Sequence, residues 1–426
     1  MLPQGWALAS LDELLGTVDV EPEYANVTRH PSIVMPWLED DPHLGVSQLW
    51  VSRTLAHLEQ GAVLGATGAV PITWRMEAIA PTLYAASRAS WEANLTARQV
   101  WQDWSTGEFG LTSKAHADAF ATAWLDLEGI EGTLTFAGCP GTVQFCSDGA
   151  AIDDVERRVL SLLLLAPLVS PSPEHADRWR KWSSLLTYTV AAARAACVAD
   201  EYKGFAAQAR ALPPSDERRA LANDTLLPLK QRMVAAATNL TTLLLEATDG
   251  PGEMGMLATL HLSVLFLEAS DSGFGENLLN QSAANELEIW LGSALPPSAR
   301  LPAPGFRGTE RIVCLEPRST ADFAEMMQLS VSILSVPQPV PLRVSVTAFH
   351  RPLGQGKWIP VPMSVHGTQG QVYRVSLPVD AHGGEDFEYY IRADLVEGTS
   401  LYWPPGAPER TQTVVVMGGP EAPKMS

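Results

Sequence analysis

Basic residues are scarce in this sequence. Lys and Arg together number 29 against 48 Asp and Glu, which gives a formal net charge of −19 at pH 7. A protein that binds nucleic acid or an anionic membrane surface needs a basic face that neutralises phosphates. We therefore expect neither as the main partner, and a solvated acidic surface is the ordinary interpretation of this charge.

Long apolar runs are also missing. The two longest, residues 159–169 and 256–269, are interrupted by Pro167 and by His261 and Glu268. A helix that spans a bilayer needs about 20 consecutive, mostly apolar residues. The sequence therefore predicts no membrane span.

The motifs of nucleotide, metal and serine-hydrolase sites are missing as well. The chain has no P-loop, Rossmann glycine fingerprint, nucleophile elbow or zinc-ligand spacing. His261 stands alone in an apolar run, where a packed core histidine is more common than a metal ligand. We expect no cofactor and no metal, and the pattern favours no particular oligomeric state.

Cysteine is rare, with four residues at Cys139, Cys146, Cys197 and Cys314. Cys139 and Cys146 enclose a Pro-Gly turn at a spacing that a local disulfide can close. Free buried thiols are the alternative, because a reduced cysteine packs as a small apolar residue.

Asparagine is rare too, but its placement is informative. Five of the seven asparagines begin an Asn-x-Ser/Thr sequon, whereas chance would give about one. The sequence therefore predicts N-glycosylation and the secretory pathway, with an extracellular, lysosomal or vacuolar destination. No charged, hydrophobic leader occurs around residues 2–15, so we expect a secreted form to have a further amino-terminal part. The candidate glycosylation sites are Asn26, Asn94, Asn223, Asn239 and Asn280.

The composition is that of a globular protein. It is 46% hydrophobic and 18% charged over 426 residues, which is long enough for two or three domains. We expect a multidomain α+β protein whose pattern changes at a Gly-rich stretch and at a Pro-rich hinge. The expected segments are the carboxyl-terminal part of a (β/α)-barrel-like domain at 1–130, an α-helical bundle at 131–294, a Pro-rich linker at 295–307, a β-sandwich at 308–418 and a tail at 419–426.

The chain is organised around residues 30–110. Two short apolar runs, Ser32 to Leu38 and Ala69 to Trp74, are bounded by Pro and Gly and predict buried strands. Between them, residues 47–60 have apolar positions at helical spacing, with Gly61 as the expected stop. Strand, helix, strand is the unit of a parallel sheet, and catalytic groups lie beyond the carboxyl ends of such strands.

Acidic and aromatic side chains gather where these two strands end. Cleavage of a glycosidic bond needs a protonated carboxyl near the leaving oxygen and a second group that stabilises the oxocarbenium-like centre. Glu39 and Asp40 are the candidate catalytic residues, because neighbouring like charges help to keep one carboxyl protonated. A solvated strand-to-helix loop is the alternative interpretation of this acidic run. The candidate substrate-binding residues are Trp37, Asp41, Trp74, Arg75 and Glu77.

The stretch from Gly68 to Glu77, followed by a helix that ends in Ala89-Ser90-Trp91, is similar to the last barrel strand and helix of β-N-acetylhexosaminidase-like glycoside hydrolases. The resemblance implies a (β/α) barrel, a glycoside hydrolase activity and a carbohydrate substrate. It also implies that Trp74 stacks on the sugar and that Glu77 bonds its hydroxyl groups.

Beyond this region the pattern is first helical and then alternating. Further helices are expected at 9–15, 80–91, 114–127, 153–165, 174–212 and 215–247. After the Pro-rich hinge the apolar period changes to two, which predicts an immunoglobulin-like β-sandwich. Its expected strands are 342–349, 372–377, 387–393 and 411–416.

Two functions remain open. The first is the carboxyl-terminal part of a secreted glycoside hydrolase, because a complete barrel takes about 250 residues and the barrel-like pattern fills only about the first 100. The second is a non-catalytic secreted glycoprotein that binds glycans or proteins through its sandwich. An exposed aromatic face with Trp358, Tyr402 and Trp403 would favour the second function.

Overall fold

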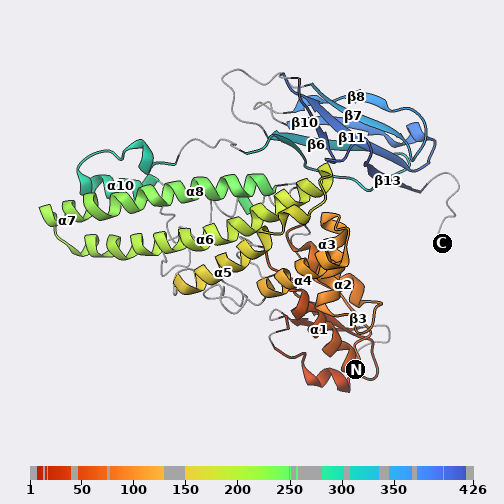
Figure 1. Cartoon of the computed structure of the whole chain (residues 1–426), viewed down its shortest axis with the longest axis horizontal. Helices are drawn as coiled ribbons and strands as arrows, with labels where there is room; N and C mark the ends of the chain where they lie inside the picture. The colour runs from red at the N-terminus through yellow and green to blue at the C-terminus, as the bar shows by residue number, and fades with distance from the viewer. Residues whose placement is uncertain are drawn as a thin grey trace. The chain divides into compact units, whose positions relative to one another are not determined.

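The computed structural model describes residues 7–12, 15–16, 18–39, 47–73, 77–128, 149–248, 250, 256–257, 281–301, 308–334, 345–366, 372–396 and 398–418. Helices and sheets both contribute, which is consistent with an α+β protein. The chain forms two compact units (Figure 1). Unit 1 comprises Met1–Ser170, Trp182–Leu244 and Gly255–Ala303, and unit 2 comprises Pro171–Lys181, Leu245–Met254 and Pro304–Ser426.

Unit 1 contains a three-stranded parallel sheet. Its strands are β1 (Leu8–Asp12), β2 (Ser32–Pro36) and β3 (Gly68–Ala69), in the order β1-β2-β3. The prediction of a helix at 9–15 is wrong, because all 5 residues of β1 pair with β2. A run this short does not distinguish a strand from a helix by its apolar period. The first predicted buried strand occurs as β2. The prediction of a buried strand from Ala69 to Trp74 is wrong in burial and length, because β3 comprises only Gly68–Ala69 and is exposed.

Helix α1 (Val51–Val63) follows β2, and the chain then forms β3, as the strand-helix-strand prediction requires. Gly61 does not stop this helix as expected, because it lies inside α1, buried against Val34 of β2. A Cβ atom at Gly61 would lie 2.8 Å from Val34 Cγ1. The glycine therefore permits a close approach of helix and strand.

Four more helices continue unit 1. They are α2 (Ala80–Ala89), α3 (Ala97–Phe109), α4 (Lys114–Glu128) and α5 (Gly149–Leu163). Thr96 caps α3 in a capping box with Gln99, and Gly110 ends it at a φ of 63°. Both features agree with the sequence pattern. Four buried tryptophans pack in one connected cluster in the core, in which Trp104 and Trp124 contact each other and both Trp101 and Trp182.

The predicted long helical region is present. Helix α6 (Pro173–Ala211) has 39 residues. After a turn come α7 (Asp216–Leu221), a π-helical turn η4 (Ala222–Leu226), α8 (Leu227–Ala247) and later α10 (Gln281–Leu291). An ion pair of 3.4 Å between Arg232 and Glu201 joins α8 to α6, and the two helices run side by side in Figure 1.

Unit 2 contains two β-sheets with one shared core. The first has the order β4-β6-β10-β9, and the second has the order β5-β13-β11-β7-β8 with β12 on β11. Buried residues of both sheets form a single hydrophobic cluster, so we call the pair of sheets the sandwich. Its strands are β4 (Arg311–Cys314), β5 (Thr320–Asp322), β6 (Met326–Leu334), β7 (Ser345–Pro352), β8 (Ile359–Pro362), β9 (Ser364–His366), β10 (Val372–Pro378), β11 (Phe387–Asp394), β12 (Ser400–Trp403) and β13 (Gln412–Met417).

The cysteines differ in their states. Cys197 of α6 is disulfide-bonded, whereas Cys314 of β4 is a free, buried thiol. The predicted local pairing of Cys139 with Cys146 lies outside the described residues, as does His261. Within the described ranges no helix combines the length and apolarity that a membrane crossing requires.

Candidate functional site

The carboxyl end of the parallel sheet is built by the segments that follow β2 and β3. A bridge joins Trp37 to Ile72 beyond the regular strands. The Ile72 nitrogen donates to the Pro36 carbonyl at 2.9 Å, and the Leu38 nitrogen donates to the Ile72 carbonyl at 3.0 Å. This pairing brings the next residues of the two segments, Glu39 and Thr73, to the same edge of the sheet.

Glu39 is fully buried at this edge, with 0% of its surface exposed. Its Oε1 atom accepts a hydrogen bond of 3.1 Å from the Thr73 hydroxyl. A buried carboxyl group without hydrogen bonds would be strongly destabilising. The threonine therefore orients the carboxyl of Glu39, which is what a proton donor or an electrostatic stabiliser in an enzyme requires.

The other predicted site residues fall into two groups. Trp37 is half-buried beside Glu39, and Glu77 is exposed in the 3₁₀ turn η2 (Glu77–Ile79) that precedes α2. Four residues lie outside the described part of the chain: Asp40, Asp41, Trp74 and Arg75. Thr73 was missed from the sequence, although its place immediately before Trp74 at the end of a predicted strand is a usable signal.

The predicted glycosylation sites are accessible where the structure describes them. Asn26, Asn94, Asn223 and Asn239 are exposed, whereas Asn280 lies outside the described residues. Asn94 has a φ of 60°, a left-handed conformation that asparagine tolerates better than most residues. Exposure is a necessary condition for a glycan on the folded protein.

An aromatic cluster lies on the outer face of the second sandwich sheet. Phe349 of β7 stacks on Tyr390 of β11 with ring centroids 4.7 Å apart, and Trp358 meets Tyr390 edge-on at 4.8 Å. Tyr402 of β12 lies 6.5 Å from Tyr390. Trp403 does not join this face: the residue is half-buried, and its ring stacks on Tyr389 and packs against the sandwich core. Its strand partner is Ile391, whose side chain faces inward.

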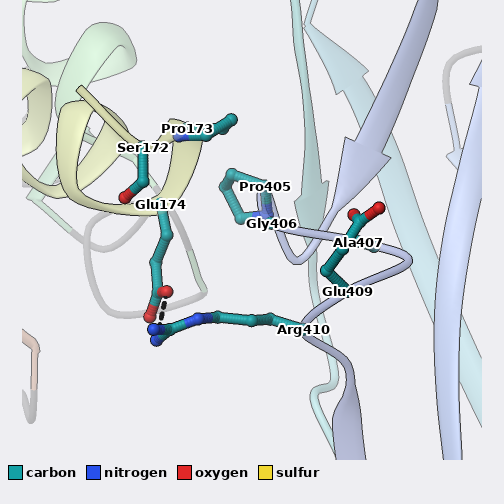
Figure 2. Close-up of a pocket in the computed structure, with 8 residues that line it drawn as sticks. All are labelled: Ser172, Pro173, Glu174, Pro405, Gly406, Ala407, Glu409 and Arg410. Carbon is teal, nitrogen blue, oxygen red and sulfur yellow. Dashed lines mark ion pairs between the residues drawn. The ribbon is translucent and has the colours of Figure 1, made fainter.

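Unit 2 also contains a pocket of about 290 Å³ (Figure 2). It lies between the first turn of α6 and the loop that follows β12. Its charged wall is an ion pair between Glu174 and Arg410, which point toward one another in Figure 2. The other lining residues are Ser172, Pro173, Pro405, Gly406, Ala407 and Glu409. Of its three ionic side chains, Glu174 and Arg410 are paired with each other and Glu409 is the third, so we take the strand-end carboxyl as the stronger candidate.

Shifted titratable groups occur in the packed parts of both units. Burial lowers the pKa of Lys230 in α8 to about 8 and raises the pKa of the Cys314 thiol to about 12. The Cys314 thiol is therefore protonated and unreactive at neutral pH. In the part of the chain that the structure describes, no group of three or more His, Cys, Asp or Glu residues could hold a metal ion.

The sequence matches no known protein-family model and no curated protein. The functional assignment therefore depends on the geometry of the chain itself.

Proposed function

We propose that this protein acts on carbohydrates, as a glycoside hydrolase or as the carboxyl-terminal part of one. The observation that carries the proposal is the fully buried carboxyl of Glu39, held by Thr73 at the carboxyl end of a parallel sheet. This is the edge where the catalytic groups of (β/α) barrels lie.

The order of the strands supports a barrel segment. β1, β2 and β3 are parallel and are neighbours in sequence order, α1 connects β2 to β3, and α2 follows β3. A (β/α) barrel repeats the strand-helix-strand step around its wall, and β2-α1-β3 follows this step. The described residues between β1 and β2 contain a 3₁₀ turn, η1 (Pro22–Asn26). Three strands are fewer than half of an eight-stranded barrel, so this sheet supplies one sector of the proposed active site.

The sandwich supports a carbohydrate-active enzyme that carries an immunoglobulin-like module. The order β4-β6-β10-β9 corresponds to strands A, B, E and D of that fold, and β13-β11-β7 corresponds to G, F and C. The short strand β5 pairs in parallel with β13. This pairing is expected if the first strand of the fold is split, with β4 in the first sheet and β5 in the second.

Each site residue has a proposed chemical role. Glu39 and Asp40 supply the general acid and the group that stabilises the developing positive charge. Trp37 and Trp74 stack on the apolar face of the sugar. Hydrogen bonds to the sugar hydroxyls come from three further residues: Asp41, Arg75 and Glu77.

The compartment is proposed to be the secretory pathway. The four described sequon asparagines are exposed. A disulfide at Cys197 is typical of proteins that fold in an oxidising compartment. Both observations support an extracellular, lysosomal or vacuolar glycoprotein.

The test is hydrolysis of chromogenic hexosaminides and glucuronides by the purified chain and by Glu39→Gln. We expect the substitution to lower kcat by at least about 100-fold, in the range for loss of one acid-base group. Circular dichroism checks that the variant is folded. Glu59→Gln, an exposed carboxylate on α1, is the matched control and should keep full activity.

Two results would contradict parts of the proposal. Equal turnover by Glu39→Gln and the wild type would remove Glu39 from the site. Glycan binding without any turnover by the wild type would rule out catalysis by this chain alone. It would leave a part of a hydrolase or the non-catalytic alternative, in which the protein binds glycans or proteins through its sandwich.

A further inference from the structure

The outer face of the second sandwich sheet has an unusual composition for the exposed side of a β-sheet. Tyr390 and Phe349 are direct cross-strand partners and stack with an interplanar angle of 6°. Trp358, from the loop between β7 and β8, covers Tyr390 edge-on. Tyr402 adds a fourth ring from β12. We call these four rings the aromatic cluster.

Two arginines lie on the rings of the aromatic cluster. The Arg351 guanidinium lies 4.1 Å from the centroid of Trp358, and that of Arg392 lies 5.1 Å from Phe349. Arg351 uses its Nε atom to bind Glu388 at 2.6 Å. No hydrogen bond of its two Nη groups occurs among the described residues, and the side chain is 26% exposed beside the indole ring of Trp358.

The charge presented by this face is positive, although the chain as a whole has a net charge of −19. Lys357 is exposed next to Trp358 and forms no ion pair within the described residues. The carboxylate of Glu388 is only 9% exposed, because it accepts bonds from Arg351, Gly354 and Thr411. Asp394 is paired with Arg392 at 3.1 Å. Arg351 and Arg392 are thus each paired with one carboxylate and keep further N–H donors, and Lys357 is the cation of this face without an ion pair among the described residues.

These features specify the chemistry of a ligand. Tyr390 is itself only 6% exposed, whereas Phe349, Trp358 and Tyr402 are half-buried, so the ring surface within reach of a ligand belongs to these three side chains. An accessible aromatic ring binds the apolar face of a pyranose ring. A guanidinium beside it binds a carboxylate or a sulfate through two parallel hydrogen bonds. A neutral sugar would use the rings alone, and an acidic peptide would use the cations alone.

We propose that the aromatic cluster, with Arg351 and Lys357, is a binding site for an acidic oligosaccharide, one whose sugars carry carboxylate or sulfate groups. The site lies on the sandwich and does not involve Glu39. The proposed binding site is therefore independent of the proposed hydrolase activity, and each can be tested without the other.

The experiment measures binding of the full chain by isothermal titration calorimetry. The probes are a hyaluronan octasaccharide with carboxylates, a chondroitin sulfate octasaccharide with carboxylates and sulfates, neutral chitohexaose, and poly-glutamate. We expect binding to at least one acidic oligosaccharide, and the preferred one identifies the anionic group. Trp358→Ala and Lys357→Gln should each weaken it about fivefold or more, as for an anchor residue of an interface.

The controls separate a local effect from a general one. Trp91→Ala is the control for Trp358→Ala, because Trp91 is 73% exposed and lies in unit 1. Lys114→Gln is the control for Lys357→Gln, because the Lys114 side chain is 82% exposed. Both should bind as the wild type does. If Trp358→Ala does not fold, Trp358→Phe and Lys357→Gln carry the test. Hydrolysis of a small chromogenic substrate should be unchanged in all of these variants.

Four results would overturn the proposal. They are no binding to either acidic oligosaccharide, equal binding to poly-glutamate, a preference for chitohexaose, and unchanged affinity in a folded Trp358→Ala protein. The last result would assign the aromatic cluster to packing of the sandwich alone.

Discussion

The carboxylate of Glu128, the last residue of α4, caps the first turn of α1 at Ser52. Its Oε1 atom accepts a bond of 3.1 Å from the Ser52 backbone nitrogen, and its Oε2 atom accepts from the Ser52 hydroxyl. Trp50, the N-cap residue, makes no side-chain cap. A residue 76 positions away therefore satisfies the free donors at the start of the helix that connects β2 to β3.

Glu128→Ala should destabilise unit 1. The substitution removes both bonds to Ser52, which is itself exposed, and we expect a loss of about 0.5–2 kcal/mol in the free energy of unfolding, as for loss of a helix cap. Urea unfolding followed by tryptophan fluorescence measures it. The matched control is Glu59→Ala on the exposed side of α1, and an equal loss in both variants would contradict the capping role.

Gly61→Ala should also destabilise unit 1, although alanine is the better helix former. The new Cβ would lie 2.8 Å from Val34 Cγ1, and such an overlap in a packed core costs about 1–3 kcal/mol. Gly204→Ala in α6 is the control, because nothing lies within 4 Å of its added Cβ. There we expect a gain of up to about 1 kcal/mol. Opposite signs in urea unfolding are the expected outcome, and a gain at both positions would show that α1 and β2 are not closely packed.

Gly61 also shows where sequence reasoning reached its limit. The helix was predicted from apolar spacing, and the glycine was interpreted as its stop. Local pattern does not distinguish a glycine that ends a helix from one that permits a close contact, because the contact depends on Val34, 27 positions earlier in the numbering. The same reason explains β1, whose pairing with β2 overrides a weak helical pattern.

The candidate site was predictable in part. A carboxyl at the end of a buried strand is visible in the sequence, so Glu39 was found. Its orientation by Thr73 was not, because it depends on the register between the segments after β2 and β3. In the sandwich, alternation predicted β7, β10, β11 and β13. Several short strands have too few residues to show a period, among them β5 and β9.

The exposed sequons predict a glycoprotein. Expression in a eukaryotic secretory host should give a product whose mass falls after treatment with an N-glycosidase, and each occupied Asn→Gln variant should lack one glycan. Asn94 offers a sharp comparison. Asn94→Asp removes the sequon and keeps a residue type that tolerates the left-handed φ of 60°, whereas Thr96→Ala also removes the cap of α3 and should cost about 1 kcal/mol of stability.

The secretory assignment has a clear contrary result. If the secreted protein shows no change in mass after glycosidase treatment, the sequons are unused and the glycoprotein prediction is wrong. Thr96→Ser keeps both the sequon and the cap, so it should retain the glycan and the stability of the wild type.

A buried pair of histidines predicts that the sandwich loses stability in acid. His350 Nδ1 lies 2.9 Å from His382 Nε2, and both residues are buried. Burial, with a contribution from His382, lowers the pKa of His350 to about 4, and burial also lowers the pKa of His382. In the unfolded chain both imidazoles take up protons near pH 6.5. The unfolded state thus binds more protons between about pH 6.5 and pH 4, so stability falls as the pH drops through this window.

His350→Gln should remove much of this pH dependence. We expect the wild type to lose about 1–3 kcal/mol from this pair between pH 7 and pH 4, and the variant to lose less over the same range. Urea unfolding at a series of pH values measures both. His366→Gln is the control, because His366 is exposed on β9 and its loss should leave the pH profile unchanged. Identical profiles for His350→Gln and the wild type would show that another group causes the acid sensitivity.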